Sequence, residues 1–187
     1  GGSHSCALND NGNVVCWGDN SDGAVDPFVS ATSLDPTLLP YTNVEKIGSG
    51  DGFTCALQRF GAEPQVTCWG RNTSGQIGPF INVPMGTIGQ DIVIGPAVDR
   101  DIIDLSVGKE HACAVVEDFG TRQVYCWGND ASGQLGRGTS SVTPDTPDPV
   151  VVGSFPITDA EVVGASWRSV SGARMRARSS SLREGSK

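Results

Sequence analysis

The tripeptide Cys-Trp-Gly occurs three times in this chain, as Cys16-Trp17-Gly18, Cys68-Trp69-Gly70 and Cys126-Trp127-Gly128. A second cysteine, followed by alanine and an aliphatic residue, precedes each copy, at Cys6, Cys55 and Cys113. These first cysteines are spaced by 49 and 58 residues, a period typical of the blades of a β-propeller. The repeat therefore predicts an all-β fold of about three four-stranded blades.

The two cysteines of each copy predict the register of a β-hairpin. If Cys6 faces Cys16, Leu8 faces Val14 and the turn contains Gly12, as a three-residue hairpin loop requires. The same rule pairs Leu57 with Val66 around Gly61 and Ala62 in the second copy. It pairs Val115 with Val124 and Glu117 with Arg122 in the third, with the turn at Phe119 and Gly120. Because side chains alternate along a strand, the cysteines share a face with the aliphatic pairs.

Opposed strand residues are close enough for a disulfide, so the register favours Cys6 with Cys16, Cys55 with Cys68 and Cys113 with Cys126. A zinc site is the competing interpretation, but the spacings are not those of zinc knuckles, and the chain has only two histidines. Buried free thiols in a reducing compartment are the third possibility.

Composition and charge narrow the class of protein. The 187 residues include 25 Gly and 11 Pro, and 37% are hydrophobic, which suits a chain with many short strands and turns. Residues 1–167 carry seven Lys or Arg against twenty Asp or Glu, a net charge of −13. An acidic body argues against a nucleic-acid partner, because such binding relies on cations that neutralise phosphates. No apolar run is long enough to cross a bilayer.

Three linked motifs carry a family resemblance. They are Gly-x-x-His-x-Cys-Ala, then Val-x-Cys-Trp-Gly, then Asn-x-x-Gly-Gln followed by an aliphatic residue and Gly. This pattern resembles the repeat of the regulator of chromosome condensation family over residues 1 to about 164, in a cysteine-containing variety that looks secreted and bacterial. The resemblance implies a seven-bladed β-propeller that recognises proteins through rim loops. The first copy departs from it at Gly23-Ala24-Val25, and the second has Phe53 in place of His.

The repeats divide the chain near residues 1–43, 44–101 and 102–156, with a fourth repeat beginning at 157–167. We expect residues 1–164 to form an incomplete propeller that belongs to a longer protein, since propellers use about four to eight blades. Residues 168–187 carry six cations and one anion and show no strand pattern. They are interpreted as a disordered basic tail, or as an off-frame translation that interrupts the fourth repeat.

Candidate sites in the sequence favour structural roles. The run Asp19 to Gly23 is similar to the start of a calcium loop, but Ser30 stands where the acidic twelfth ligand is needed. His4 and His111 are interpreted as hydrogen-bonded structural residues. Trp17, Trp69 and Trp127 are expected to pack between blades rather than to bind a ligand. No catalytic, cofactor-binding or metal-binding residues are predicted.

The sequence therefore predicts a non-catalytic protein-binding module in a disulfide-stapled propeller. We place it outside the cell, at the cell surface or in the periplasm, because disulfides persist in oxidising compartments. The partner is expected to be another protein that contacts the rim loops, and the open set of blades is expected to self-associate. The alternative is a guanine-nucleotide exchange factor or regulator of a small GTPase, which the resemblance implies and which requires a reducing compartment.

Overall fold

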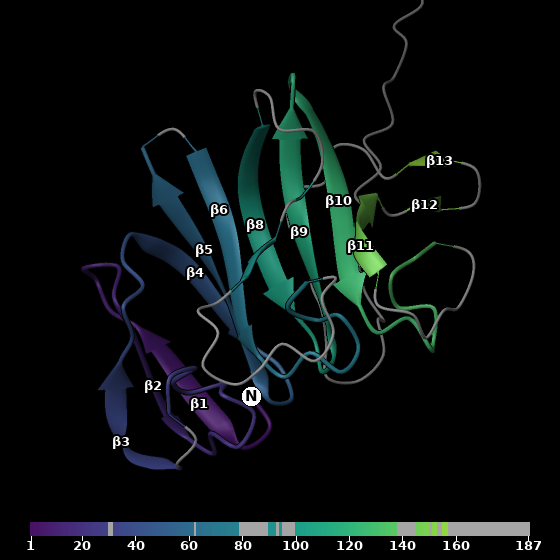
Figure 1. Cartoon of the computed structure of the whole chain (residues 1–187). Coiled ribbons are helices and arrows are strands. Elements are labelled where there is room, and N and C mark those ends of the chain that lie inside the picture. Colours follow the sequence, from purple (N-terminus) through teal and green to yellow (C-terminus); the bar gives the residue numbers. More distant parts are fainter. Residues whose placement is uncertain are drawn as a thin grey trace, which may run out of the picture.

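The computed structural model describes residues 1–29, 32–61, 63–78, 90–92, 94, 100–137, 145–149, 151–152 and 155–156. All regular elements in these residues are strands. Three antiparallel sheets stand side by side along the chain (Figure 1). The expectation of an all-β fold with blade-like units is confirmed, and the fourth repeat at 157–167 and the tail at 168–187 lie outside the described residues.

Each sheet is a simple meander whose strands follow one another along the chain. The first contains β1 (His4–Leu8), β2 (Val14–Gly18) and β3 (Ser33–Leu38). The second contains β4 (Val44–Ser49), β5 (Phe53–Phe60), β6 (Glu63–Gly70) and β7 (Gln90–Ile92). The third contains β8 (Arg100–Val107), β9 (His111–Asp118), β10 (Thr121–Gly128) and β11 (Asp145–Pro149). A two-stranded pair follows, β12 (Val151–Val152) and β13 (Phe155–Pro156).

The first sheet has three strands where four were expected. Alignment on the cysteines places Gly1 at the position of Gly50, so no residue of the first repeat corresponds to β4. The second and third sheets have the expected four.

The hairpin registers are as predicted. Cys6 pairs with Cys16 and Leu8 with Val14 across β1 and β2. The second hairpin opposes Cys55 to Cys68 and Leu57 to Val66, and the third opposes Cys113 to Cys126 and Glu117 to Arg122. The cysteine and aliphatic side chains of each hairpin pack together in one cluster, which in the first and second hairpins also includes residues of the next sheet.

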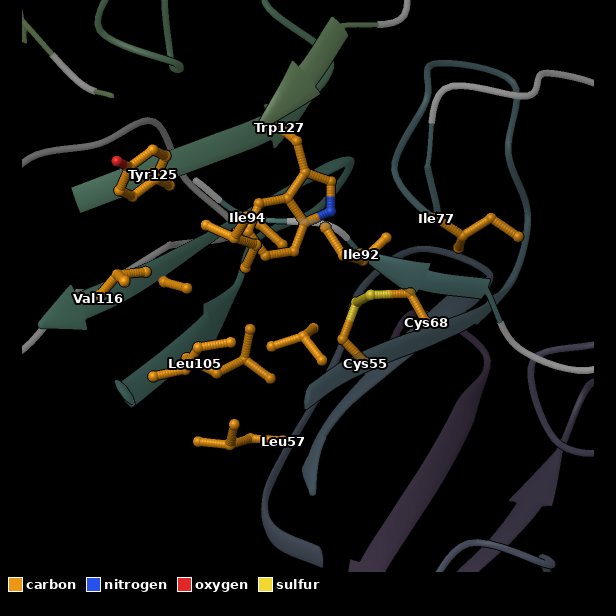
Figure 2. Close-up of a cluster of buried hydrophobic side chains, with 14 of the residues drawn as sticks. Cys55, Leu57, Cys68, Ile77, Ile92, Ile94, Leu105, Val116, Tyr125 and Trp127 are labelled. Atoms are coloured by element: carbon orange, nitrogen blue, oxygen red, sulfur yellow. A yellow bond between two sulfur atoms is a disulfide. The ribbon is translucent and has the colours of Figure 1, made fainter. Parts of the chain in front are cut away.

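The core between the second and third sheets is the largest cluster in the described residues. Trp127 of β10 lies near Ile92 and Ile94, with the Cys55–Cys68 disulfide of the second sheet and Ile77 of the loop after β6 on the far side of Ile92 (Figure 2). Trp127 and Ile94 are fully buried. The aliphatic residue after each Gly-Gln, Ile77 or Leu135, is also buried, as its place in the repeat predicts.

Successive sheets are also joined by main-chain hydrogen bonds at the loops before β1, β5 and β9. Gly2 N donates to Gly50 O at 3.2 Å, and Asp51 N donates to Lys109 O at 2.8 Å. The two donors are equivalent, because Gly2 aligns with Asp51, whereas the two acceptors differ by one position, because Gly50 aligns with Gly108. Successive sheets are therefore joined at corresponding loops.

Candidate protein-interaction surface

The three cysteine pairs are the structural centre of each repeat. The structure joins Cys6 to Cys16, Cys55 to Cys68 and Cys113 to Cys126, with Cα atoms 4.1 Å apart in each pair. No free cysteine is present. The sulfur atoms are turned into the core, where Cys16, Cys55 and Cys68 are fully buried. They hold the hairpins together and offer no accessible thiol for chemistry.

The tryptophan beside each disulfide contacts the preceding sheet. Trp69 is fully buried, donates from Nε1 to Ala24 O at 2.9 Å and stacks on Tyr41 with ring centroids 4.5 Å apart. Trp127 is fully buried and donates to Gln76 O at 3.1 Å. Trp17 is 36% exposed, because no earlier sheet covers it in the described residues. Two of the three tryptophans therefore lie between sheets.

The glycine that follows each tryptophan permits a sharp turn. Gly18, Gly70 and Gly128 have φ of 111°, 105° and 104°, a region that favours glycine. A Cβ on Gly70 would lie 2.4 Å from Gly52 O. The turn brings the next backbone amide onto the start of the hairpin, as when Arg71 N donates to Gly52 O at 2.7 Å.

The loops after these glycines form one rim of the array, which we call the loop rim. Its central side chain is Arg71, which donates to Asp22 of the first repeat at 2.7 Å and to Asp51 at 3.2 Å. The hydrogen bond to Asp22 raises the pKa of Arg71 above its usual value. In the next repeat Asn129 Nδ2 donates to Glu110 at 2.8 Å. Arg71 and Asn129 of the loop rim thus bind carboxylates of the same chain.

The two histidines lie beneath the loop rim. His4 Nε2 lies 2.8 Å from Thr54 Oγ1 of the next repeat, and burial lowers the pKa of His4 to about 4. Burial also lowers the pKa of His111, whose Nε2 has no hydrogen-bond partner among the described residues. Neither ring is reachable by a substrate, since each is only 4% exposed.

The candidate calcium loop is a structural turn. Asp19 accepts the amide of Ser21 at 3.0 Å, and Asn20 Oδ1 accepts the amide of Val25 at 2.8 Å. Across the residues that the structure describes, no group of three or more His, Cys, Asp or Glu could hold a metal ion. No helix of the described part is long and apolar enough to cross a membrane.

The tips of the cysteine hairpins form the opposite rim, which we call the hairpin rim. It contains Phe60 at the end of β5 and Phe119 in the turn between β9 and β10. Phe119 is 76% exposed and Phe60 is 48% exposed. Arg59 of β5 connects the second sheet to the third, since it donates to Glu45 of β4 at 2.8 Å and to Asp101 of β8 at 3.0 Å.

Phe119 is unusual in both its surroundings and its backbone. Its φ is 45°, in the left-handed region that bulky residues avoid at a cost of roughly 1–2 kcal/mol. The equivalent residue of the second hairpin is Gly61, with φ of 68°. A large apolar side chain is therefore held in solvent at a position that suits glycine, and neither turn stability nor core packing accounts for it.

The hairpin rim was not identified from the sequence. The turn at Phe119 and Gly120 was predicted, but the register gives no indication of which tip side chains stay exposed. One sequence feature could have indicated this surface. Phe119 stands in the hairpin turn at the position of Gly61, where the turn requires a positive φ that favours glycine.

The fold defines a class of protein, a partial β-propeller built from repeated antiparallel sheets. Models of the regulator of chromosome condensation (RCC1) repeat match residues 1–24 and 102–134, and residues 123–166. The chain belongs to this repeat family.

Relatives of known name support the family assignment. The human E3 ubiquitin-protein ligase HERC2 is 31% identical over 143 residues, which cover 75% of this chain and 3% of the relative. Protein RCC1 of Candida albicans is 29% identical over 191 residues, which cover 92% of this chain and 40% of the relative. The chain thus spans less than half of the length of each.

Solved structures with similar folds show the same architecture. Human WBSCR16 superposes with a TM-score of 0.66 at 19% identity, covering 88% of this chain and 41% of that one. Yeast RCC1 (Prp20), crystallised with Kap60, superposes with a TM-score of 0.65 at 18% identity, covering 88% of this chain and 38% of that one. At this level of identity, the likeness establishes the fold alone.

Proposed function

We propose that this chain is a non-catalytic protein-binding module that contacts its partner through the hairpin rim. The observation that carries the proposal is Phe119, an exposed aromatic side chain on a strained turn. Strained residues persist where function maintains them, and aromatic anchors are enriched among residues that dominate binding energy. Phe60 and the ion pairs of Arg59 would surround this anchor with a second apolar contact and a polar margin.

The partner is a protein, because the anchor is an exposed side chain on a hairpin tip: Phe119 is 76% exposed. Small-molecule sites are concave and enclose most of the ligand surface. A hairpin tip with an exposed aromatic side chain instead fits a pocket on a macromolecule. Yeast RCC1 (Prp20), which has a similar fold, was crystallised bound to Kap60.

The module is proposed to work in an oxidising compartment: outside the cell, at its surface or in the periplasm. All six cysteines are paired, and three disulfides in three hairpins are uncommon in reducing compartments. Mass measurement after alkylation without reductant tests this part. Three intact disulfides are expected, and six alkylated thiols would overturn the assignment to an oxidising compartment.

The binding surface is tested by replacing Phe119 with glycine. Because glycine accepts the φ of 45°, Phe119→Gly should keep or raise the melting temperature while it removes the anchor. Immobilised oxidised protein is compared with this variant for capture of partners from periplasmic or culture extracts, with captured proteins identified by mass spectrometry. Leu34→Ser, at another exposed apolar position, is the matched control.

A partner retained by wild type and by Leu34→Ser, but lost by Phe119→Gly, is the expected result. Equal capture by all three proteins would contradict the hairpin rim as the binding surface. Melting temperatures of the same samples show whether any loss reflects unfolding instead.

The second candidate function is nucleotide exchange on a small GTPase. Its support is the similarity to Protein RCC1 of Candida albicans, and it requires a reducing environment in which these hairpins would lose their disulfides. Release of a fluorescent guanine nucleotide from a purified Ran-type GTPase separates the two functions. Acceleration by this chain would favour exchange, whereas an unchanged release rate is expected for the binding module.

A further inference from the structure

The loop after the second Cys-Trp-Gly turn contains the one N-glycosylation motif of the sequence. Asn72-Thr73-Ser74 has the form Asn-x-Ser in which x is not Pro, and no other asparagine of the 187 residues has Ser or Thr two positions later. Asn20, at the same position of the first repeat, is followed by Asp22 at that distance, and the third repeat has Asp130 there. Such a motif normally marks a surface loop of a secreted protein.

The folded turn conceals the amide that would carry the glycan. The Asn72 side chain is only 6% exposed, whereas Thr73 beside it is exposed to solvent. Asn72 Nδ2 donates to Gly78 O at 3.1 Å, and Oδ1 accepts the amide of Ile77 at 2.9 Å. Both ends of the side-chain amide are therefore used to close the turn, and its nitrogen is directed at a main-chain carbonyl rather than at solvent.

The same turn holds the second sheet against the third. Ile77 is buried in the cluster between these sheets (Figure 2), and Gln76 O accepts the indole N–H of Trp127 at 3.1 Å. Ser74 N donates to Gln76 Oε1 at 2.7 Å, so the residues from Asn72 to Ile77 form one hydrogen-bonded unit. A sugar ring does not fit beside a side chain so deeply buried, and it can be attached only if this unit opens. Opening would remove Ile77 from the core and Gln76 O from Trp127.

We propose that Asn72 is an N-glycosylation acceptor in the unfolded chain, and that glycosylation of Asn72 and closure of its turn exclude each other. In the transfer, Asn72 Nδ2 attacks the anomeric carbon of an oligosaccharide linked to a polyprenyl diphosphate. The N-glycosidic bond forms while the bond from that carbon to the diphosphate oxygen breaks. Nδ2 loses one proton to a base of the transferase, and polyprenyl diphosphate leaves.

The exclusion makes this modification a switch between two fates of the chain. On a secretory route that glycosylates nascent chains, transfer competes with folding, because a closed turn no longer offers Nδ2 and a glycosylated chain cannot close the turn. The glycosylated chain retains its hairpin registers, which are determined locally, but it loses the contacts of Ile77 and Gln76 with the third sheet. The hairpin rim takes no part in this switch, so the proposal is independent of the binding surface there.

The proposal is tested by secretion of the full chain, directed by a cleavable signal peptide, from a eukaryotic cell line. Cells are grown with and without a membrane-permeant dithiol that keeps the nascent chain reduced. Mass spectrometry should locate a glycan at Asn72 in the reduced chains. Without the dithiol, we expect unglycosylated chains to be secreted and glycosylated chains to be retained in the cell, with loss of amide protection over residues 73–78 in hydrogen exchange.

Two variants separate the motif from the fold. Ser74→Ala removes the acceptor motif but leaves Asn72 and both of its hydrogen bonds in place, so this protein should be secreted without glycan and in higher yield than wild type. Addition of Asn13→Thr to Ser74→Ala creates a motif at Asn11, an exposed residue in the turn of the first hairpin. This second variant should be glycosylated at Asn11 and still be secreted with native protection over residues 73–78.

Either of two results would overturn the proposal. The first is a secreted wild-type protein that carries the glycan at Asn72, has the melting temperature of the unglycosylated protein and protects the amides of residues 73–78. It would show that the turn closes around the modified side chain, and the comparison is made between two fractions of the same wild-type sample. The second is the absence of glycan at Asn72 in chains that the dithiol keeps reduced, which would show that Asn72 is not an acceptor.

Discussion

Asn20, Asn72 and Asp130 occupy the same position after the three Cys-Trp-Gly turns, and each is at most 6% exposed. Their Oδ1 atoms accept equivalent amides, those of Val25, Ile77 and Leu135, at 2.8, 2.9 and 2.8 Å. The two asparagines also donate from Nδ2 to main-chain carbonyls, for example to Gly78 O at 3.1 Å. Asp130 Oδ2 has no such donor hydrogen and makes no hydrogen bond within the described residues. A buried polar atom in this state lowers stability.

Asp130→Asn should therefore stabilise the protein, by about 1 kcal/mol, since it replaces an unpaired acceptor by an Nδ2 donor of the kind that Asn20 and Asn72 use to bind main-chain carbonyls. Urea denaturation measures the change. The reciprocal substitution Asn72→Asp is the control, and it should destabilise by a similar amount because it creates the same defect in the second repeat. Unchanged stability in both variants would show that the Oδ2 or Nδ2 atom at this position does not affect the free energy of unfolding.

His4 links stability to pH. Its folded pKa, lowered to about 4 mainly by burial, lies below the usual value of 6.5, so the folded state binds the proton more weakly than the unfolded state. The stability present above pH 6.5 is then lost as pH falls from about 6.5 to about 4, by at most about 3 kcal/mol. Melting temperature across this range measures the loss.

His4→Phe tests whether His4 causes this loss of stability at low pH. Phenylalanine is a suitable replacement because Phe53 occupies the same position in the second repeat. This variant should lose less stability between pH 6.5 and 4 than wild type. His111 is buried with a lowered pKa as well, so part of the acid sensitivity should persist. An identical pH profile in the variant would rule out His4 as a source of that sensitivity.

At the scale of the element, the hairpins were predictable because their determinants are local. The cysteines, the aliphatic pairs and the glycines of the turns all lie within each strand pair, and they determine register without long-range information. The partners of Trp69 and Arg71 were not predictable, since both lie about 45 to 49 residues earlier and depend on how sheets pack. The exposed anchor at Phe119 was missed for the same reason, because exposure is a property of the assembled sheets.

Removal of one disulfide should destabilise its hairpin without changing the register. Replacing both Cys55 and Cys68 by alanine should lower the free energy of unfolding by about 3 kcal/mol, through the added freedom of the unfolded chain. The loss should be smaller for the Cys6 and Cys16 pair, because Cys6 is only partly buried and leaves less of a cavity. Guanidinium denaturation of both variants measures the two losses in the free energy of unfolding. Equal losses would contradict a contribution from the cavity that the removed sulfur atoms leave.

At the scale of the whole molecule, stability depends on the contacts that join one sheet to the next. Lys46 of β4 forms an ion pair with Asp104 of β8, and Arg59 of β5 forms one with Asp101. Trp69 is one of the contacts that join the first sheet to the second, and it combines a buried indole, a hydrogen bond and stacking on Tyr41. In an array of repeats, each unit is stabilised by its neighbours, so loss of one such contact should act locally.

Trp69→Phe should therefore uncouple the first sheet from the other two. The loss of the hydrogen bond to Ala24 O and of part of the buried ring should weaken this interface by about 1–2 kcal/mol. Hydrogen exchange measured by mass spectrometry should show faster exchange in β1 and β2 and unchanged protection in β9 and β10. Trp17→Phe is the matched control: it makes the same chemical change at a position covered by no sheet in the described residues, so it should leave exchange in all strands unaltered. Uniformly faster exchange in Trp69→Phe would instead mean that the three sheets unfold as one cooperative unit, because a local loss at one interface would then be shared by every strand.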